Sequence, residues 1–203
     1  MEFDVIGPEF DVLATAAPAC NPCASAANAP AKKIAVLTSM RNEGLAVLEW
    51  VAYYRSLRVD TISVYTNDNT DGSDRLLDVL ARHGVIQLAR STSAPGVSPQ
   101  LKAFRHAFNH SEALWQHDWV PMLDADQFVG PLLGGDFIDD FPYYLGEIER
   151  RFGASALCLN WKWFSGDLSF SRSAGTTLER FAHSVNNDHV KTLFRLRHTA
   201  DIA

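Results

Sequence analysis

The sequence predicts an α/β fold in which a mostly parallel sheet is built from strand–helix–strand units and flanked by helices. Short apolar runs typical of buried strands alternate with segments whose apolar residues recur at helical spacing. The 203 residues, 47% of them hydrophobic and 21% charged, are also enough to bury one sizeable core. Right-handed crossovers would place the carboxyl ends of the strands at one edge of the sheet.

The first predicted unit begins at Lys32. Residues 1–31 are rich in Ala, Pro and Asn without apolar periodicity, so we expect them to form a disordered tail or linker. The apolar run in KKIAVLTSM is short enough for a buried strand. Leu48, Val51 and Tyr54 then recur at three-residue steps, which predicts a helix. TISVYT follows as the second predicted strand.

The alternation continues along one domain, which we place at residues 32–203. NDNTDGS supplies turn residues and a helix cap, DRLLDVLARHG is predicted to be a helix ended by Gly84, and VIQLAR is a third strand. Residues 101–115 carry apolar side chains on one helical face and precede WVPML, the fourth predicted strand. A helix over residues 138–152 and a strand at ALCLNW complete the pattern.

Three loops behind predicted strands are strongly polar: SMRNEG, TNDNTDGS and LDADQF. Ligands of such sheets bind beyond the carboxyl ends of the strands, so these loops are candidates for a site. Asp124 and Asp126 are two residues apart, so both carboxylates of an extended segment project to one side, where hard oxygens suit Mg²⁺ or Mn²⁺ bound to a diphosphate. A solvated turn is the competing interpretation of this pair, and turns with helix caps are the competing interpretation of the other two loops.

Composition restricts the partners. A formal net charge of -6 argues against non-specific binding to nucleic acid or to an anionic membrane. The first ten residues carry three acidic side chains and no Lys or Arg, so no secretory signal is expected and the cytoplasm is the expected location. Prolines interrupt the uncharged run at residues 12–31, so no transmembrane segment is expected. Cys20 and Cys23 lack a second cysteine pair, which argues against a zinc site.

Four separated motifs together resemble a known family. TSMRNEGLAVLEW, VYTNDNTDGS, LDADQF and NWKWFSG occur in the order typical of the glycosyltransferase family 2 type with an R-N-E…E-W signature, which is related to the family 92 group. The resemblance covers about residues 33–196. It implies a GT-A fold and a metal-dependent, inverting transfer of a hexosyl group. The expected donor is a nucleotide-diphosphate sugar, with a UDP-sugar foremost, and the expected acceptor is a glycan or another hydroxyl compound.

The resemblance also implies roles for individual residues. Those implied at the nucleotide are Arg41, Asn42, Glu43, Asp68 and Asp71. Those implied at the Mn²⁺ or Mg²⁺ ion and the diphosphate are Asp124 and Asp126. Those implied at the acceptor or diphosphate side are Asn160, Trp161, Trp163, Phe164, Lys191 and Arg195. Inversion needs a general base, for which we predict Asp167, with Asp136, Asp139 and Asp140 as rivals.

Two departures from the family pattern keep alternatives open. The aspartate motif usually reads D-A-D-E-F, and Gln127 here removes a carboxylate beside the metal. Relatives normally continue beyond the position of Ala203, so a C-terminally truncated domain is one interpretation of this sequence. A non-catalytic remnant that binds a nucleotide sugar or glycan is therefore one alternative. A D-x-D phosphotransferase is another, although such enzymes carry the motif on the first strand and here it follows the fourth.

Overall fold

The computed structural model describes residues 32–92, 96–133, 135–165, 175–181 and 183–196. The predicted tail at residues 1–31 and the predicted base Asp167 lie outside the described residues.

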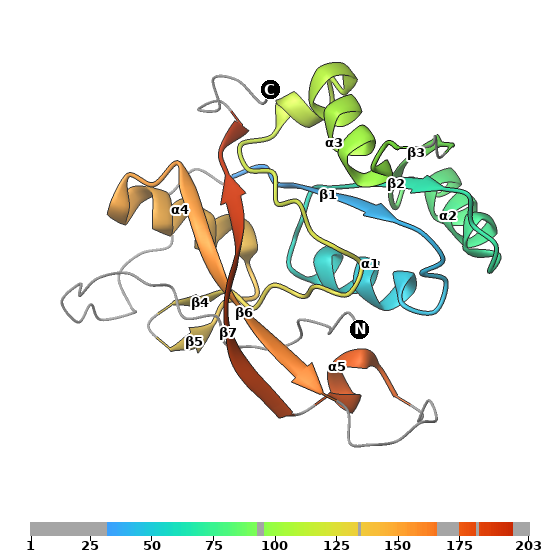
Figure 1. Cartoon of the computed structure of the whole chain (residues 1–203). Coiled ribbons are helices and arrows are strands. Elements are labelled where there is room, and N and C mark those ends of the chain that lie inside the picture. The colour runs from blue at the N-terminus through green and yellow to red at the C-terminus, as the bar shows by residue number, and fades with distance from the viewer. Residues whose placement is uncertain (1–31, 93–95, 134, 166–174, 182, 197–203) are drawn as a thin grey trace.

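A three-stranded parallel sheet forms the first half of the fold (Figure 1). Its strands are β1 (Ala35–Met40), β2 (Thr61–Asn67) and β3 (Gln87–Ser91), in that order. Helix α1 (Val47–Ser56) connects β1 to β2, and α2 (Ser73–Arg82) connects β2 to β3. The predicted α/β class with strand–helix–strand units is therefore confirmed.

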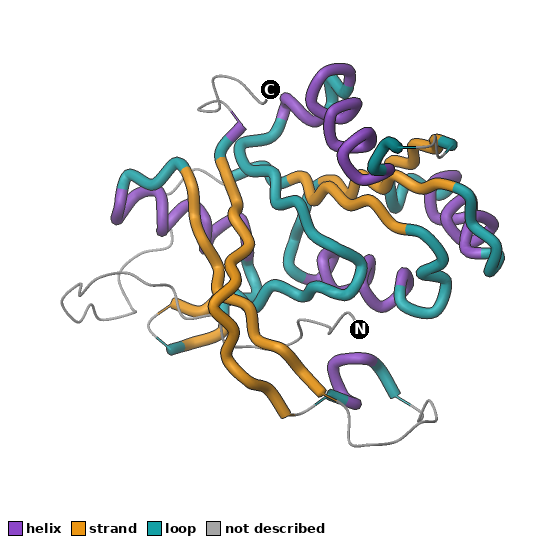
Figure 2. Tube along the Cα trace, in the orientation of Figure 1, coloured by secondary structure: helices purple, strands orange, loops and turns teal. Residues whose placement is uncertain are grey.

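Side chains of β1 alternate between two hydrophobic clusters, as the period of a strand requires. Val36 and the preceding Ile34 face the cluster that contains α1, whereas Ala35 and Leu37 face the cluster built with α3 (Pro99–His110). The sheet consequently lies between two helical layers (Figure 2). This buried sheet fixes where the loops after β1 and β2 emerge.

The predicted strand WVPML lies beside β1 but forms only isolated parallel bridges with it. The β1 amides of Ala35 and Leu37 donate to the Trp119 and Pro121 carbonyls at 3.1 and 2.9 Å. Pro121 has no N–H to return, which interrupts the ladder. On its other side the amide of Val120 donates to the Phe194 carbonyl at 3.2 Å, so this segment links the parallel sheet to the separate second half of the fold through isolated bridges.

That second half is an antiparallel pair of β6 (Ala156–Ser165) and β7 (His183–Phe194). The sequence predicted β6 but not β7, and the mostly parallel sheet that it indicated did not include this antiparallel pair. The reason is compositional: most of β7 is exposed, so HSVNNDHVKTLF lacks the apolar run by which a buried strand is recognised. An antiparallel pair tolerates such a solvent-facing strand.

The remaining elements are either shorter than the sequence predicted, newly found, or helices that begin directly after a capping residue. Helix α4 (Phe141–Phe152) starts after Asp140, whose carboxylate accepts from the Tyr143 amide at 2.9 Å. The helix expected over residues 101–115 ends at His110 and is followed by the turn η1 (Leu114–Gln116). Strands β4 (Leu132–Leu133) and β5 (Asp136–Phe137) form a small unpredicted hairpin.

Helix α5 (Thr177–Arg180) is fastened to α1 by one carboxylate. Glu49 accepts from the amides of Thr177 at 2.7 Å and Leu178 at 3.0 Å. None of the helices in the described part of the chain has the length and apolar composition needed to cross a membrane.

Candidate functional site

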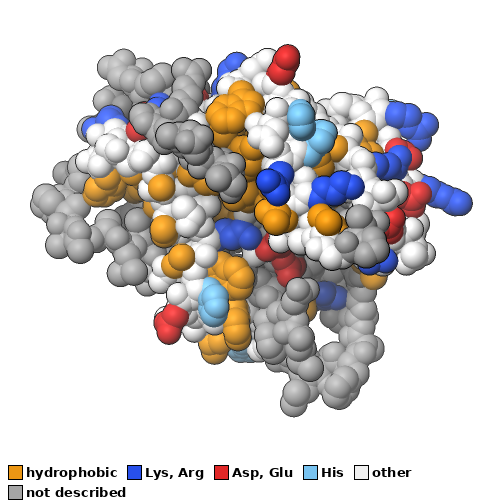
Figure 3. Space-filling view, turned by 45° about the horizontal axis from the view of Figure 1, so that its top comes forward, with side chains coloured by type: hydrophobic (Ala, Val, Ile, Leu, Met, Phe, Trp, Pro, Cys, Tyr) orange, Lys and Arg blue, Asp and Glu red, His pale blue; other side chains and the backbone are white. Residues whose placement is uncertain are grey.

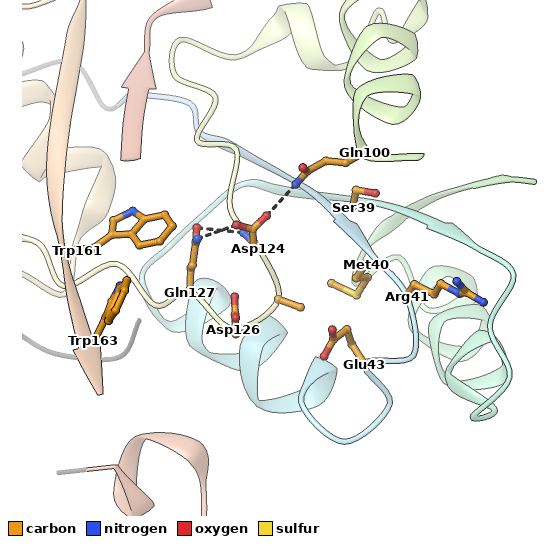
Figure 4. A pocket seen from close by; sticks show the side chains of 11 residues that line it. Ser39, Met40, Arg41, Glu43, Gln100, Asp124, Asp126, Gln127, Trp161 and Trp163 are labelled. Carbon is orange, nitrogen blue, oxygen red and sulfur yellow. Dashed lines mark hydrogen bonds between the residues drawn. The ribbon is translucent and has the colours of Figure 1, made fainter. Parts of the chain in front are cut away.

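A pocket of about 450 Å³ opens where the loop after β1, the DADQ segment, the start of α3 and strand β6 converge (Figure 4). Its volume lies within the range of small-molecule sites. It is lined by Ser39, Met40, Arg41, Glu43, Gln100, Asp124, Ala125, Asp126, Gln127, Trp161 and Trp163. Three of the four sequence motifs thus meet in one cavity, at the edge where the strands of the sheet end.

The fourth motif, after β2, is hydrogen-bonded to the loop after β1. Arg41 Nε donates to the Asp68 carbonyl at 3.2 Å, and the amide of Asn42 donates to Asn69 Oδ1 at 2.9 Å. The Thr70 amide donates in return to Asn42 Oδ1 at 2.8 Å. Asn42 and Asp68 adopt left-handed φ angles of 60° and 44°, a conformation that asparagine and aspartate tolerate better than most residues. The predicted nucleotide loops are therefore held together, beside a second cavity of about 590 Å³.

Asp71 fastens these two loops to the start of α2. Its carboxylate accepts from the Ser73 hydroxyl at 2.6 Å, the Ser73 amide at 2.9 Å and the Gly44 amide at 3.0 Å. These bonds, that of the Ser73 hydroxyl foremost, hold the pKa of Asp71 below its ordinary value of 3.8. A Cβ at Gly44 would lie only 3.0 Å from Asp71 Oδ2, so glycine permits this close approach.

Asp71→Asn is expected to lower the melting temperature at neutral pH, because the amide cannot accept all three bonds. The folded-state pKa is depressed, so the contribution of Asp71 is complete above pH 3.8 and disappears as the pH falls through the lower folded value. Thermal unfolding of both proteins from pH 7 into the acid range checks this. Asp74→Asn, on the first turn of the same helix, controls for the loss of charge. A difference that stays constant below pH 3.8 would contradict the assignment.

Asp124 is the centre of a hydrogen-bonded group at the floor of the pocket. Its Oδ1 accepts from Gln100 Nε2 at 2.9 Å, and its Oδ2 accepts from Gln127 Nε2 at 2.7 Å (Figure 4). Lys191 Nζ of β7 also lies 3.0 Å from Oδ2, and the Asp124 amide donates back to Gln127 Oε1 at 3.2 Å. Asp124 therefore joins α3, β7 and its own loop.

Three aromatic side chains of α1, Trp50, Tyr53 and Tyr54, hold this loop from below, and we call them the α1 aromatic cluster. The Gln127 carbonyl accepts from Trp50 Nε1 at 3.0 Å and from the Tyr54 hydroxyl at 2.8 Å. The Tyr54 hydroxyl accepts from the Val129 amide at 3.1 Å, and Tyr53 donates to the Val129 carbonyl at 2.6 Å. Burial raises the pKa of both tyrosines, which keeps them protonated as donors.

Strand β6 supplies an aromatic wall opposite the nucleotide loops. Trp161 and Trp163 line the pocket, and His189 of β7 stacks against both, with ring centroids 5.5 and 6.5 Å away. On the face shown in Figure 3, acidic and basic side chains meet beside a hydrophobic patch that carries a histidine. Aromatic faces next to polar groups are a common way to bind sugar rings.

Several residues implied by the resemblance lie elsewhere. Phe164 is buried in the main core, and Asn160 does not line the pocket. Arg195 Nη1 pairs with Glu149 Oε1 at 3.2 Å, away from the pocket. Asp140 caps α4 and pairs with Arg58, and neither Asp136 nor Asp139 lines the pocket, so none of the three predicted rivals to Asp167 is a lining residue.

The sequence analysis assigned no role to Gln100 and did not indicate three kinds of contact at the site. These are the bond from Gln127 to Asp124, the stacking of His189 on the tryptophans, and the hydrogen bonds made by the α1 aromatic cluster. A signal existed only for the last of these, because aromatic residues with polar tips at positions i, i+3 and i+4 occupy one helical face.

The predicted divalent ion does not fit the donor set at Asp124 as it is arranged. Three N–H donors, one of them a lysine ammonium, occupy a carboxylate that has about four acceptor positions. Asp126 and Glu43 are the other carboxylates that line the pocket. Within the described ranges, no group of three or more His, Cys, Asp and Glu side chains is placed to hold an ion. Metal binding by Asp124 and Asp126 stays a prediction, and an ion bound there would compete with Lys191 for Asp124 or be repelled by it.

Comparison with known proteins identifies a distant relative by sequence. No protein family model matches the chain. A curated protein of Ricinus communis, described as a glycosyltransferase family 92 protein, is 27% identical over 96 residues, which make up 47% of this chain. The chain spans 17% of the length of that relative. The resemblance to glycosyltransferases expected from the motifs is therefore confirmed over about half of the chain.

Among solved structures, the chain is similar to TarS of S. aureus. A structure of TarS residues 1–349 has a TM-score of 0.43 at 11% identity, over 61% of this chain and 34% of that one. The same fragment in complex with UDP has a TM-score of 0.41 at 13% identity, with the same coverage.

Proposed function

We propose that the protein binds a nucleotide-diphosphate sugar in the pocket and transfers the sugar to a hydroxyl acceptor. The observation that carries this proposal is the convergence of the β1 loop, the DADQ segment and the tryptophans of β6 in one cavity. The loops after β1 and β2 supply the polar side chains that a ribose or a base would need, and Trp161 and Trp163 supply apolar faces for a sugar. Descent from a glycosyltransferase agrees with this arrangement.

The proposed reaction needs positive charge at the diphosphate and a general base at the acceptor hydroxyl. The acceptor oxygen forms a bond to the anomeric carbon as the bond from that carbon to the diphosphate breaks, and the electron pair leaves with the diphosphate. Positive charge near the leaving group stabilises it, and a general base accepts the acceptor proton. Asp167 remains our predicted base. The donor we propose is a UDP-hexose, transferred with inversion of configuration.

Isothermal titration calorimetry with UDP tests the nucleotide half of this proposal, and a screen of UDP-sugars for sugar release tests the chemical half. We expect UDP to bind and at least one UDP-hexose to be turned over. UDP binding without sugar release from any donor would favour the non-catalytic remnant. Failure of UDP to bind, both with Mn²⁺ and with a chelator, would contradict the proposed function.

Trp161→Ala is expected to slow acceptor-dependent transfer by about twofold to tenfold, the range of one lost aromatic contact, and to leave UDP affinity unchanged. Steady-state kinetics with varied acceptor, alongside UDP titration, checks this. Val185→Ala is the matched control, because Val185 is an exposed apolar residue of the paired strand β7 and does not line the pocket. An equal effect of Trp161→Ala on UDP affinity would place this wall at the donor instead of the acceptor.

A further inference from the structure

A cation lies directly behind Asp124, which lines the pocket, although the lysine that carries it does not itself line that pocket. Lys191 reaches from β7 to within 3.0 Å of Asp124 Oδ2. It borders a small recess with Gln127 and Trp161, both of which also line the main pocket. The Lys191 side chain is 23% exposed, so its charge is only partly screened by water.

The surrounding side chains hold Lys191 and Asp124 together. Gln127 is buried, donates to the same carboxylate oxygen as Lys191 and is itself uncharged, so it adds no second negative charge that could attract an ion. Gln100 binds the other oxygen. A divalent ion at Asp124 would have to displace an ammonium group and two amides, or to lie beside the ammonium at unfavourable like-charge distance.

We propose that the Lys191 ammonium, in place of a divalent metal ion, neutralises the diphosphate of the donor. This inference rests on the proposed function. A lysine ammonium has three N–H donors and is a common phosphate ligand, so Lys191 is able to retain its bond to Asp124 while it donates to a phosphate oxygen. Arg41 lines the main pocket on the side of the nucleotide loops, where its Nε donates to the Asp68 carbonyl, so it is a separate cation from Lys191. Nucleotide binding by this protein then needs no added metal.

UDP titration of the wild-type protein in EDTA and in Mn²⁺ is the first test. We expect UDP to bind in EDTA, with an affinity within about twofold of that in Mn²⁺. Binding that appears only with Mn²⁺ would overturn the role of Lys191 and leave the proposed function intact. The absence of binding in both conditions would instead overturn the proposed function, so the two failures are distinguishable.

Variants locate the effect on one side chain. In EDTA, Lys191→Met is expected to weaken UDP binding by about tenfold to a hundredfold, the size of a lost charge-assisted hydrogen bond, while Lys191→Arg retains most of the affinity. Lys102→Met removes the same charge from an exposed position of α3, where Lys102 contacts the Thr92 carbonyl, and is expected to leave UDP affinity unchanged. Uridine, which lacks the diphosphate, should bind Lys191→Met and wild type alike. Unchanged UDP affinity of Lys191→Met, or an equal loss for uridine, would refute the proposal.

Discussion

Trp50→Ala is expected to lower the free energy of unfolding by about 3–5 kcal/mol, the range for a large aromatic side chain removed from a packed core. Trp50 is fully buried and packs against Tyr54, with ring centroids 4.6 Å apart. Its Nε1 also donates to the Gln127 carbonyl. The substitution therefore opens a cavity under the loop that carries Asp124 and Asp126. It also removes one of the two donors to the Gln127 carbonyl.

Chemical denaturation of Trp50→Ala and Trp50→Phe separates these contributions. Phenylalanine retains most of the apolar volume and loses the N–H, so we expect a smaller loss of about 1–2 kcal/mol, because the Tyr54 hydroxyl still donates to the Gln127 carbonyl. Trp115→Ala provides the control, because that tryptophan is 43% exposed. If Trp50→Ala were no more destabilising than Trp115→Ala, Trp50 would not support the loop as described.

Local patterning was sufficient to predict the buried half of the fold. Strands β1 and β2 are apolar runs bounded by turn residues, and α1 and α2 show helical spacing, so periodicity indicates both the elements and their parallel order. The antiparallel pairing of β6 with β7 was not predictable in this way. Strand β7 is solvent-exposed over most of its length, and its place depends on partners far away in sequence, such as Val120.

The residues of the site also divide into those that local sequence patterns predict and those that depend on distant contacts. Asp124, Asp126, Arg41 and Glu43 follow short predicted strands, so the sequence indicates that they come together, and all four line the pocket. The partners of Asp124 could not be predicted in this way. Gln100 is 24 positions and Lys191 67 positions away from it in sequence, and local periodicity does not indicate contacts over such separations. Three of the five carboxylates predicted for the nucleotide and the metal, Glu43, Asp124 and Asp126, therefore line this pocket, but the sequence did not predict that Asp124 is engaged by a lysine and two amides.

Asp124→Ala is expected to be the most damaging substitution at the pocket floor, for both stability and nucleotide binding. It leaves Gln127, which is 6% exposed, without the carboxylate that its Nε2 contacts, at a cost of about 1–3 kcal/mol of unfolding free energy. It also releases Lys191 from its position, so UDP affinity is expected to fall by more than about tenfold. The ion pair itself contributes little to stability, because both partners are partly exposed.

Asp126→Ala is the matched comparison, because it removes the same side chain two residues later in the same loop. Asp126 lines the pocket, so UDP affinity is expected to fall, but the bonds between Asp124, Gln100, Gln127 and Lys191 remain. The loss of stability should then stay below about 1 kcal/mol, as for most partly exposed positions. Denaturation and UDP titration of both variants distinguish the roles. Equal losses of stability would show that Asp124 is an ordinary pocket carboxylate, and wild-type UDP affinity in Asp124→Ala would show that Lys191 does not depend on it for its position.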